Sequence, residues 1–173
     1  LNVATSGPLA PPEINVTLSS STISSVIAGV GFRKLGTGTL ALSGANTYSG
    51  TTTINAGSLA LANGSAASTG PIVVNGTAGN QYPRLLLTGT SMTLANNVTI
   101  TGTHGLSGAG ALHYGVSSGT ATVSGTVTIL TSATAGGHIS MASVSAGAML
   151  FTGPINSTPA VSLRIGTFIL AGS

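Results

Sequence analysis

The residues of this sequence that could carry out acid–base or metal chemistry are few and far apart. Glu13 is the only carboxylate side chain, and the histidines are His104, His113 and His138. Glycoside hydrolysis uses a pair of carboxylates, a calcium site takes several acidic oxygens, and a serine triad needs an aspartate. The histidine spacings match no metal motif. We therefore expect no catalytic, metal-binding or cofactor-binding residues, and we predict that the protein is not an enzyme.

The basic residues are Arg33, Lys34, Arg84 and Arg164, and the formal net charge is +3. Nucleic-acid binding needs clustered bases that neutralise several phosphates, and only Arg33 and Lys34 are adjacent. No stretch approaches the roughly 18 apolar residues of a membrane helix. The absence of cysteine rules out disulfides and thiolate metal sites. The sequence thus argues against a nucleic-acid partner and against membrane insertion of this segment.

Short runs in which apolar and small polar residues alternate fill most of the chain. Examples lie at 14–18, 39–43, 58–61, 98–100 and 127–129. This period of two is typical of half-buried strands, and no window favours a helix longer than about two turns. With 42% hydrophobic and 3% charged residues, the composition is that of a folded chain. We predict an all-β fold, a parallel β-helix (β-solenoid), with a β-sandwich or jelly roll as the alternative.

An arm followed by one domain is the predicted organisation. Residues 1–13 contain three prolines and are expected to be an extended arm, and residues 14–173 are expected to be a single β-solenoid-like domain. The sequence at 38–44 recurs in degenerate form at 166–172, which predicts a partial second repeat that starts near residue 155. Repeated strand units favour a stacked solenoid, because each coil buries its apolar face against its neighbours.

One motif spans residues 36–61. It reads G-T-G-T-L-A-L-S-G at 36–44, N-T-Y-S-G at 46–50, T-T-I at 52–54 and A-G-S-L-A-L at 56–61. This motif resembles the autotransporter-associated β-strand repeat, also called the passenger-associated transport repeat. It departs from that pattern at Thr51, where the family often has a second glycine. The resemblance implies a parallel β-helix, secretion to the bacterial cell surface, and no catalytic residues, because the family's motif is structural.

The motif combines glycines, a row of apolar residues and polar turn residues. Its members are Gly36, Gly38, Leu40, Leu42, Gly44, Asn46, Tyr48, Gly50, Ile54, Gly57, Leu59 and Leu61. The apolar members alternate with small residues, so one face of each strand is expected to be buried. Gly44, Gly50 and Gly57 are expected at corners where φ is positive.

Asn46 and Asn55 are expected either to satisfy backbone groups of the turns or to stack on asparagines of the next coil. Tyr48 is expected to cover the core at a corner rather than to bind a ligand. Because so few groups titrate, we also expect nearly constant thermal stability from about pH 4 to pH 9.

A non-catalytic extracellular module with a structural or adhesive role is the leading functional hypothesis. It would be a segment of a secreted surface passenger or a subunit of a surface filament. The alternative is a carbohydrate- or host-binding adhesin domain, which needs an aromatic platform or a polar cleft. A minor alternative is an ice-binding solenoid, suggested by Thr-x-Thr pairs such as Thr99/Thr101 and Thr120/Thr122, although their intervals are uneven.

Two kinds of partner are expected at the ends of the domain. Either the chain continues into a longer passenger, or subunits associate through their terminal strands. The residues expected in inter-subunit strands are Ile14, Val16, Leu18, Phe168, Ile169 and Leu170. An uncovered terminal coil carries unpaired N–H and C=O groups, which favour pairing with another strand. The sequence identifies no particular glycan or other surface ligand.

Overall fold

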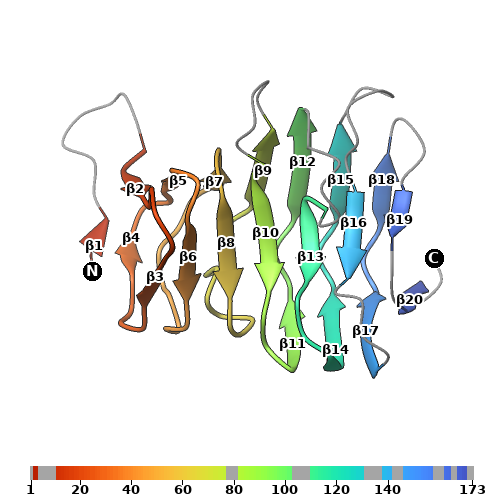
Figure 1. The fold of residues 1–173 in the computed structure, drawn as a ribbon. Coiled ribbons are helices and arrows are strands. Elements are labelled where there is room, and N and C mark those ends of the chain that lie inside the picture. The colour runs from red at the N-terminus through yellow and green to blue at the C-terminus, as the bar shows by residue number, and fades with distance from the viewer. Residues whose placement is uncertain are drawn as a thin grey trace.

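The computed structural model is a β-solenoid of stacked parallel strands (Figure 1). The structure describes residues 2–3, 11–76, 82–102, 110–130, 138–141, 146–157, 162–164 and 167–170. Within these ranges there is no helix, and neighbouring strands pair in parallel, as from β12 (Val98–Gly102) to β15 (Val127–Leu130). The prediction of a parallel β-solenoid is confirmed. The sandwich alternative is wrong, because sandwiches are built from antiparallel sheets.

Three sheets, here called I, II and III, form the sides of the solenoid. Sheet I contains β2 (Glu13–Asn15), β5 (Arg33–Leu35), β7 (Thr52–Ile54), β9 (Ile72–Gly76), β12, β15 and β18 (Ile155–Ser157). Sheet II contains β3 (Ser20–Ile23), β6 (Thr39–Leu42), β8 (Ser58–Leu61), β10 (Arg84–Leu87), β13 (Leu112–Tyr114), β16 (His138–Met141) and β19 (Ser162–Arg164). Sheet III contains β11 (Ser91–Leu94), β14 (Ser118–Val123), β17 (Ala146–Phe151) and β20 (Thr167–Leu170).

The coils lengthen along the chain. Each coil contributes one strand to sheet I and one to sheet II, and coils from β9 onward add a strand to sheet III. In the early coils, the hydrogen bond between Asn46 and Ala66 joins residues 20 apart, whereas the later bond between Thr126 and Asn97 joins residues 29 apart. The additional residues of the later coils build sheet III.

Rows of apolar side chains run through the core behind sheet II. The members of each row pair in register from coil to coil and are fully buried. One row is Leu40, Leu59, Leu85 and Leu112, and the other is Leu42, Leu61, Leu87 and Tyr114. Ile54 of sheet I is fully buried as well. Burying one such side chain stabilises the fold by roughly 2 kcal/mol, so these rows hold the coils together.

Two corner glycines of the motif are required for different reasons. Gly57 has a φ of 61°, and a Cβ atom there would lie 2.4 Å from the carbonyl oxygen of Gly38. Gly44 was expected to have a positive φ as well, but it is not among the positive-φ glycines. It is required by close approach, because a Cβ atom there would lie 2.6 Å from the carbonyl oxygen of Ser25.

The predicted N-terminal arm and the predicted partial repeat both contribute strands to the sheets. Asn2–Val3 (β1) pairs with Ala28–Gly29 (β4), and Glu13 of the predicted arm already belongs to β2. The two copies of the degenerate sequence repeat lie in different sheets, since β6 is in sheet II and β20 is in sheet III.

The described part of the chain contains no helix long and apolar enough to span a membrane.

Candidate functional site

Asn46 links three successive coils through its carboxamide. It is buried, with 6% of its surface exposed. Its Oδ1 accepts a hydrogen bond from the backbone N–H of Ile27 at 2.8 Å, and its Nδ2 donates to the carbonyl oxygen of Ala66 at 2.6 Å. Asn46 therefore satisfies turn backbone groups on both sides of its own coil, which is the first of the two roles expected for it.

Lys34 is a fully buried lysine in β5. It pairs in register with Ile14 and Ile54, and its Nζ donates to the carbonyl oxygens of Leu35, Gly36 and Ala56 at 2.8, 2.7 and 3.0 Å. Burial lowers the pKa of this amine to about 8. The ammonium thus closes the corner between sheets I and II by binding carbonyl groups of two coils.

Tyr48 packs inside a corner, as expected. Its ring is fully buried and meets Phe32 edge-on, with ring centroids 5.4 Å apart. Its hydroxyl accepts a hydrogen bond from Thr52 Oγ1 at 3.0 Å, and its carbonyl oxygen accepts one from Ser68 Oγ. Burial raises the pKa of the Tyr48 hydroxyl. A phenol enclosed in this way is not placed to bind a ligand.

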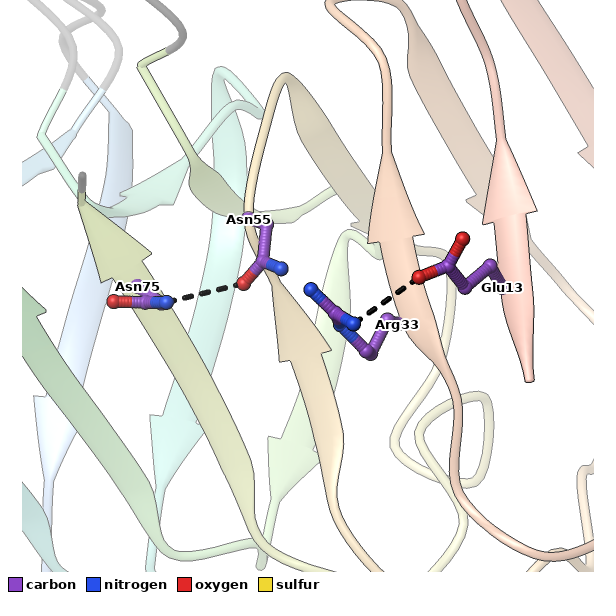
Figure 2. A network of polar contacts seen from close by, with 4 residues as sticks. All are labelled: Glu13, Arg33, Asn55 and Asn75. Carbon is purple, nitrogen blue, oxygen red and sulfur yellow. Dashed lines mark hydrogen bonds and ion pairs between the residues drawn. The ribbon is translucent and has the colours of Figure 1, made fainter. Parts of the chain in front are cut away.

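A ladder of polar side chains runs along the outside of sheet I across several coils (Figure 2). Glu13 and Arg33 form an ion pair of 3.1 Å, and Asn55 accepts from Arg33 Nη2 at 2.8 Å when its amide oxygen faces the guanidinium. The amides of Asn55 and Asn75 are 3.2 Å apart, and Thr101 Oγ1 donates to Asn75 at 3.2 Å. Asn55 therefore stacks on an asparagine of the next coil, the second of the expected roles.

Replacing Glu13 with glutamine is expected to lower the free energy of unfolding by only about 0.5 kcal/mol, because the Glu13–Arg33 pair is partly exposed to water. Salt screens such a pair, so the difference should shrink between roughly 0.1 M and 1 M salt. Chemical denaturation of both proteins at the two salt concentrations measures it. A loss above roughly 2 kcal/mol would mean that the ladder, rather than the core, secures the first coil.

The histidines do not gather into a metal or catalytic centre in the part of the chain that the structure describes. His113 lies in β13, His138 begins β16, and His104 lies outside the described residues. Burial and the nearby charge of Arg84 lower the pKa of His113. No group of three metal-ligating side chains occurs among the described residues. The only acid, Glu13, is engaged by Arg33, so a carboxylate pair for hydrolysis is lacking.

A groove of about 570 Å³ opens where the shorter coils meet the first strand of sheet III. Its lining includes Asn63, Gly64 and Ser65, together with Ser91 and Thr93 of β11. Its lining residues carry no charge and no aromatic ring. The groove offers hydrogen-bonding groups to a small uncharged polar ligand, but it has no ring on which a sugar could stack.

Two of the polar residues that shape the described structure were not singled out in the sequence. Lys34 was missed because the apolar side chain of Leu35 suggests that Leu35 faces inward, whereas the strand turns Lys34 inward and leaves Leu35 half-buried. Asn96 was missed because it lies outside the motif. Its Nδ2 donates to the carbonyl oxygens of Ala67, Ser68 and Gly70 at 3.4, 3.2 and 2.7 Å. Like Asn46, Asn96 is a buried asparagine in a corner between coils, and its amide donates to backbone carbonyl groups.

No match was found among curated proteins or among solved structures. Residues 32–61 match the family model of the passenger-associated-transport-repeat. The matched segment contains both Lys34 and Asn46 and supplies β5, β6, β7 and β8 of the solenoid. The three bonds of Lys34 lie within this segment, whereas the two partners of Asn46, Ile27 and Ala66, lie just outside it. This match confirms, for residues 32–61, the resemblance to the passenger-associated transport repeat that the motif at 36–61 indicated.

Proposed function

We propose that the chain is a non-catalytic segment of a secreted passenger that serves as a stalk or adhesive module on the bacterial surface. The observation that carries this proposal is the passenger-associated transport repeat at 32–61 within a continuous parallel stack. Such a stack is extended along one axis and stabilised by contacts between neighbouring coils, which suits a spacer that holds other groups away from a membrane. Its single carboxylate also fits a role without acid–base chemistry.

Surface exposure is the expected result that tests this proposal. Antibodies against the purified chain should label intact cells of the source organism, and protease added to intact cells should remove the label. A cytoplasmic protein that stays undigested in the same cells is the control for lysis. Labelling that appears only after the cells are broken would contradict the surface role.

A carbohydrate- or host-binding adhesin domain is the second candidate. The uncharged groove beside β11 supports it, because its serine, threonine and asparagine side chains can donate and accept hydrogen bonds. The ice-binding alternative has less support, since Thr99 and Thr101 lie in sheet I while Thr120 and Thr122 lie in sheet III. Among the described strands, Thr101 pairs with Leu130 and Thr99 with Val73, so the threonines form no continuous double row.

Association with another chain, or with further coils of a longer passenger, is proposed at the ends of the described stack. β2 and β18 are the outer strands of sheet I, and β20 is an outer strand of sheet III. Ile14 of β2 is paired within the chain to Lys34, Val16 is buried, and Leu18 is 82% exposed. Each outer strand has one free edge in the described sheets, where a further strand could be added. Light scattering of the purified chain would report such association.

A further inference from the structure

Sheet III begins in the middle of the stack, and its first strand therefore has a free edge (Figure 1). The strand order of this sheet is β11-β14-β17-β20, so among the described strands β11 pairs with β14 alone. The preceding coil passes β11 as a turn at residues 62–69, directly after β8. Unlike the two ends of the stack, this edge has earlier coils of the same chain beside it.

The ladder between β11 and β14 shows which backbone groups of β11 point to the free edge. The carbonyl oxygen of Leu94 accepts from the N–H of Ser124, so Leu94 faces β14. Successive residues of a strand direct their N–H and C=O groups to opposite edges, so Met92 also faces β14, whereas Ser91 and Thr93 face away from it. Within the described part of the chain, the backbone groups of Ser91 and Thr93 form no hydrogen bond.

The turn beside β11 forms hydrogen bonds within itself and supplies no strand. The N–H of Ala66 donates to the carbonyl oxygen of Asn63 at 3.2 Å, and the N–H of Ser68 donates to that of Ser65 at 3.1 Å. Bonds between residues three apart are those of turns, and they use donors that a strand would offer to its neighbour. The turn therefore leaves β11 without a second partner strand.

Four backbone groups lie at this edge, and three of them are left uncovered by the turn. A Cβ atom at Gly64 would lie 2.1 Å from the carbonyl oxygen of Thr93, so the turn covers that group. The other three are the carbonyl oxygen of Ser91 and the N–H groups of Ser91 and Thr93, and both residues line the groove of about 570 Å³. Natural edge strands often carry a charge or a proline that discourages pairing, and β11 has neither.

We propose that this edge binds a single extended peptide, which adds to sheet III beside β11 as a parallel strand, the direction shared by the described pairs. In a parallel ladder, the peptide residue opposite Met92 donates its N–H to the carbonyl oxygen of Ser91 and accepts from the N–H of Thr93. A second carbonyl group of the peptide accepts from the N–H of Ser91. One strand thus satisfies all three uncovered groups.

The partner is one uncharged strand rather than the end of a folded solenoid. Earlier coils continue beside the groove, so the end coil of a second solenoid would collide with them. The lining residues carry no charge, so a charged side chain would lose water there without gaining an ion pair. The strand already paired with β11 has the matching chemistry, since β14 reads Ser-Gly-Thr-Ala-Thr-Val. Such a segment on a host protein would be a ligand for the host-binding candidate function, on which this proposal rests.

The probe is an acetylated and amidated peptide with the sequence of residues 118–123, added to the purified chain and followed by NMR. In the free chain, the amides of Ser91 and Thr93 should exchange with solvent faster than those of Met92 and Leu94, which belong to the ladder with β14. The peptide should slow exchange at Ser91 and Thr93. This measurement uses the unaltered chain, so it does not depend on how a variant folds.

Thr93→Pro tests the backbone donor directly. Proline removes the N–H that faces the groove, and it is tolerated where an edge strand directs this group away from its partner. The bonds that Met92 and Leu94 form with β14 stay in place. We expect a loss of affinity of about fivefold or more, as for one hydrogen bond. Thr93→Val is the matched control, because it keeps the N–H and the branched shape, and it should bind the peptide as the unaltered chain does.

Three results would overturn the proposal. One is unchanged exchange at Ser91 and Thr93 with the peptide present, including the case in which only the outer strands of the stack respond. Another is an equal loss of affinity in Thr93→Pro and Thr93→Val, which would mean that the hydroxyl and not the backbone is recognised. The third is tighter binding of the neutral sugar maltotetraose at the same residues, which would favour a carbohydrate ligand. Failure to bind the peptide would leave the surface role intact if intact cells are still labelled.

Discussion

Replacing Asn46 with alanine is expected to lower the free energy of unfolding by about 3 kcal/mol, because two buried backbone groups lose their partner. The N–H of Ile27 and the carbonyl oxygen of Ala66 both belong to fully buried residues. Each unsatisfied group costs roughly 1–3 kcal/mol. The melting temperature should fall by about 6–10 °C, as measured by circular dichroism.

Asn63 provides the matched control for Asn46. Its Nδ2 also reaches back one coil, to the carbonyl oxygen of Ser43 at 2.9 Å, but this bond is exposed to water. Asn63→Ala should therefore cost less than about 1 kcal/mol, because water takes over the freed groups. Asn46→Asp distinguishes the contributions of the two hydrogen bonds. A carboxylate still accepts from the N–H of Ile27, but it has no N–H to donate to the carbonyl oxygen of Ala66. An equal loss of unfolding free energy in Asn46→Ala and Asn63→Ala would show that burial of the amide does not determine how much it stabilises the fold.

The buried rows and the class of fold could be predicted from the sequence because they follow from local rules. Leucines that alternate with small residues identify the inner face of β6 and β8 whatever the coil length. Asn46 could be assigned a corner role for the same reason, since it lies in a turn between strand patterns. These features depend on residues close together in the chain.

The register of the later coils could not be predicted, because it depends on the length of each connection. Leu59 pairs with Leu85, Leu85 with Leu112, and Leu112 with Ile139, at intervals set by corners that have no apolar period. Inserting or deleting one residue in any corner would move every side chain of the next strand to the opposite face of the sheet. That Arg84 and His113 lie on paired strands, β10 and β13, is visible only once those intervals are known. Sheet III escaped prediction for the same reason.

The charge count suggested constant stability between about pH 4 and pH 9, and the structure changes that expectation. A count of titratable groups says nothing about their burial, and pH dependence arises from the difference in pKa between folded and unfolded states. Burial lowers the pKa of Lys34, and burial together with the charge of Arg84 lowers the pKa of His113. Protonation of His113 is less favourable in the folded state, so stability should also fall below about pH 6.5.

Stability is expected to rise as the pH increases from about 8 to 10, by roughly 2–3 kcal/mol. Burial lowers the pKa of Lys34 from 10.5 to about 8, so in this window the unfolded chain binds more protons than the folded chain. Raising the pH removes the proton from the folded state first, and the cost of holding a buried ammonium disappears. Above about pH 10 the trend should reverse, because burial raises the pKa of Tyr48 and Tyr114 and their ionisation favours unfolding.

Urea denaturation at intervals from about pH 7 to pH 10 measures this slope, and Lys34→Met tests its origin. Methionine keeps an unbranched side chain of similar length without a titrating group, so the variant should lose the rise. Arg33→Gln changes the neighbouring residue, whose side chain lies on the outer face of the same strand, and should retain it. A Lys34→Met protein that still gains stability between pH 8 and pH 10 would show that another group carries the effect. An unaltered chain with flat stability over this range would show that the carbonyls of Leu35, Gly36 and Ala56 offset the loss of hydration and keep the ammonium charged.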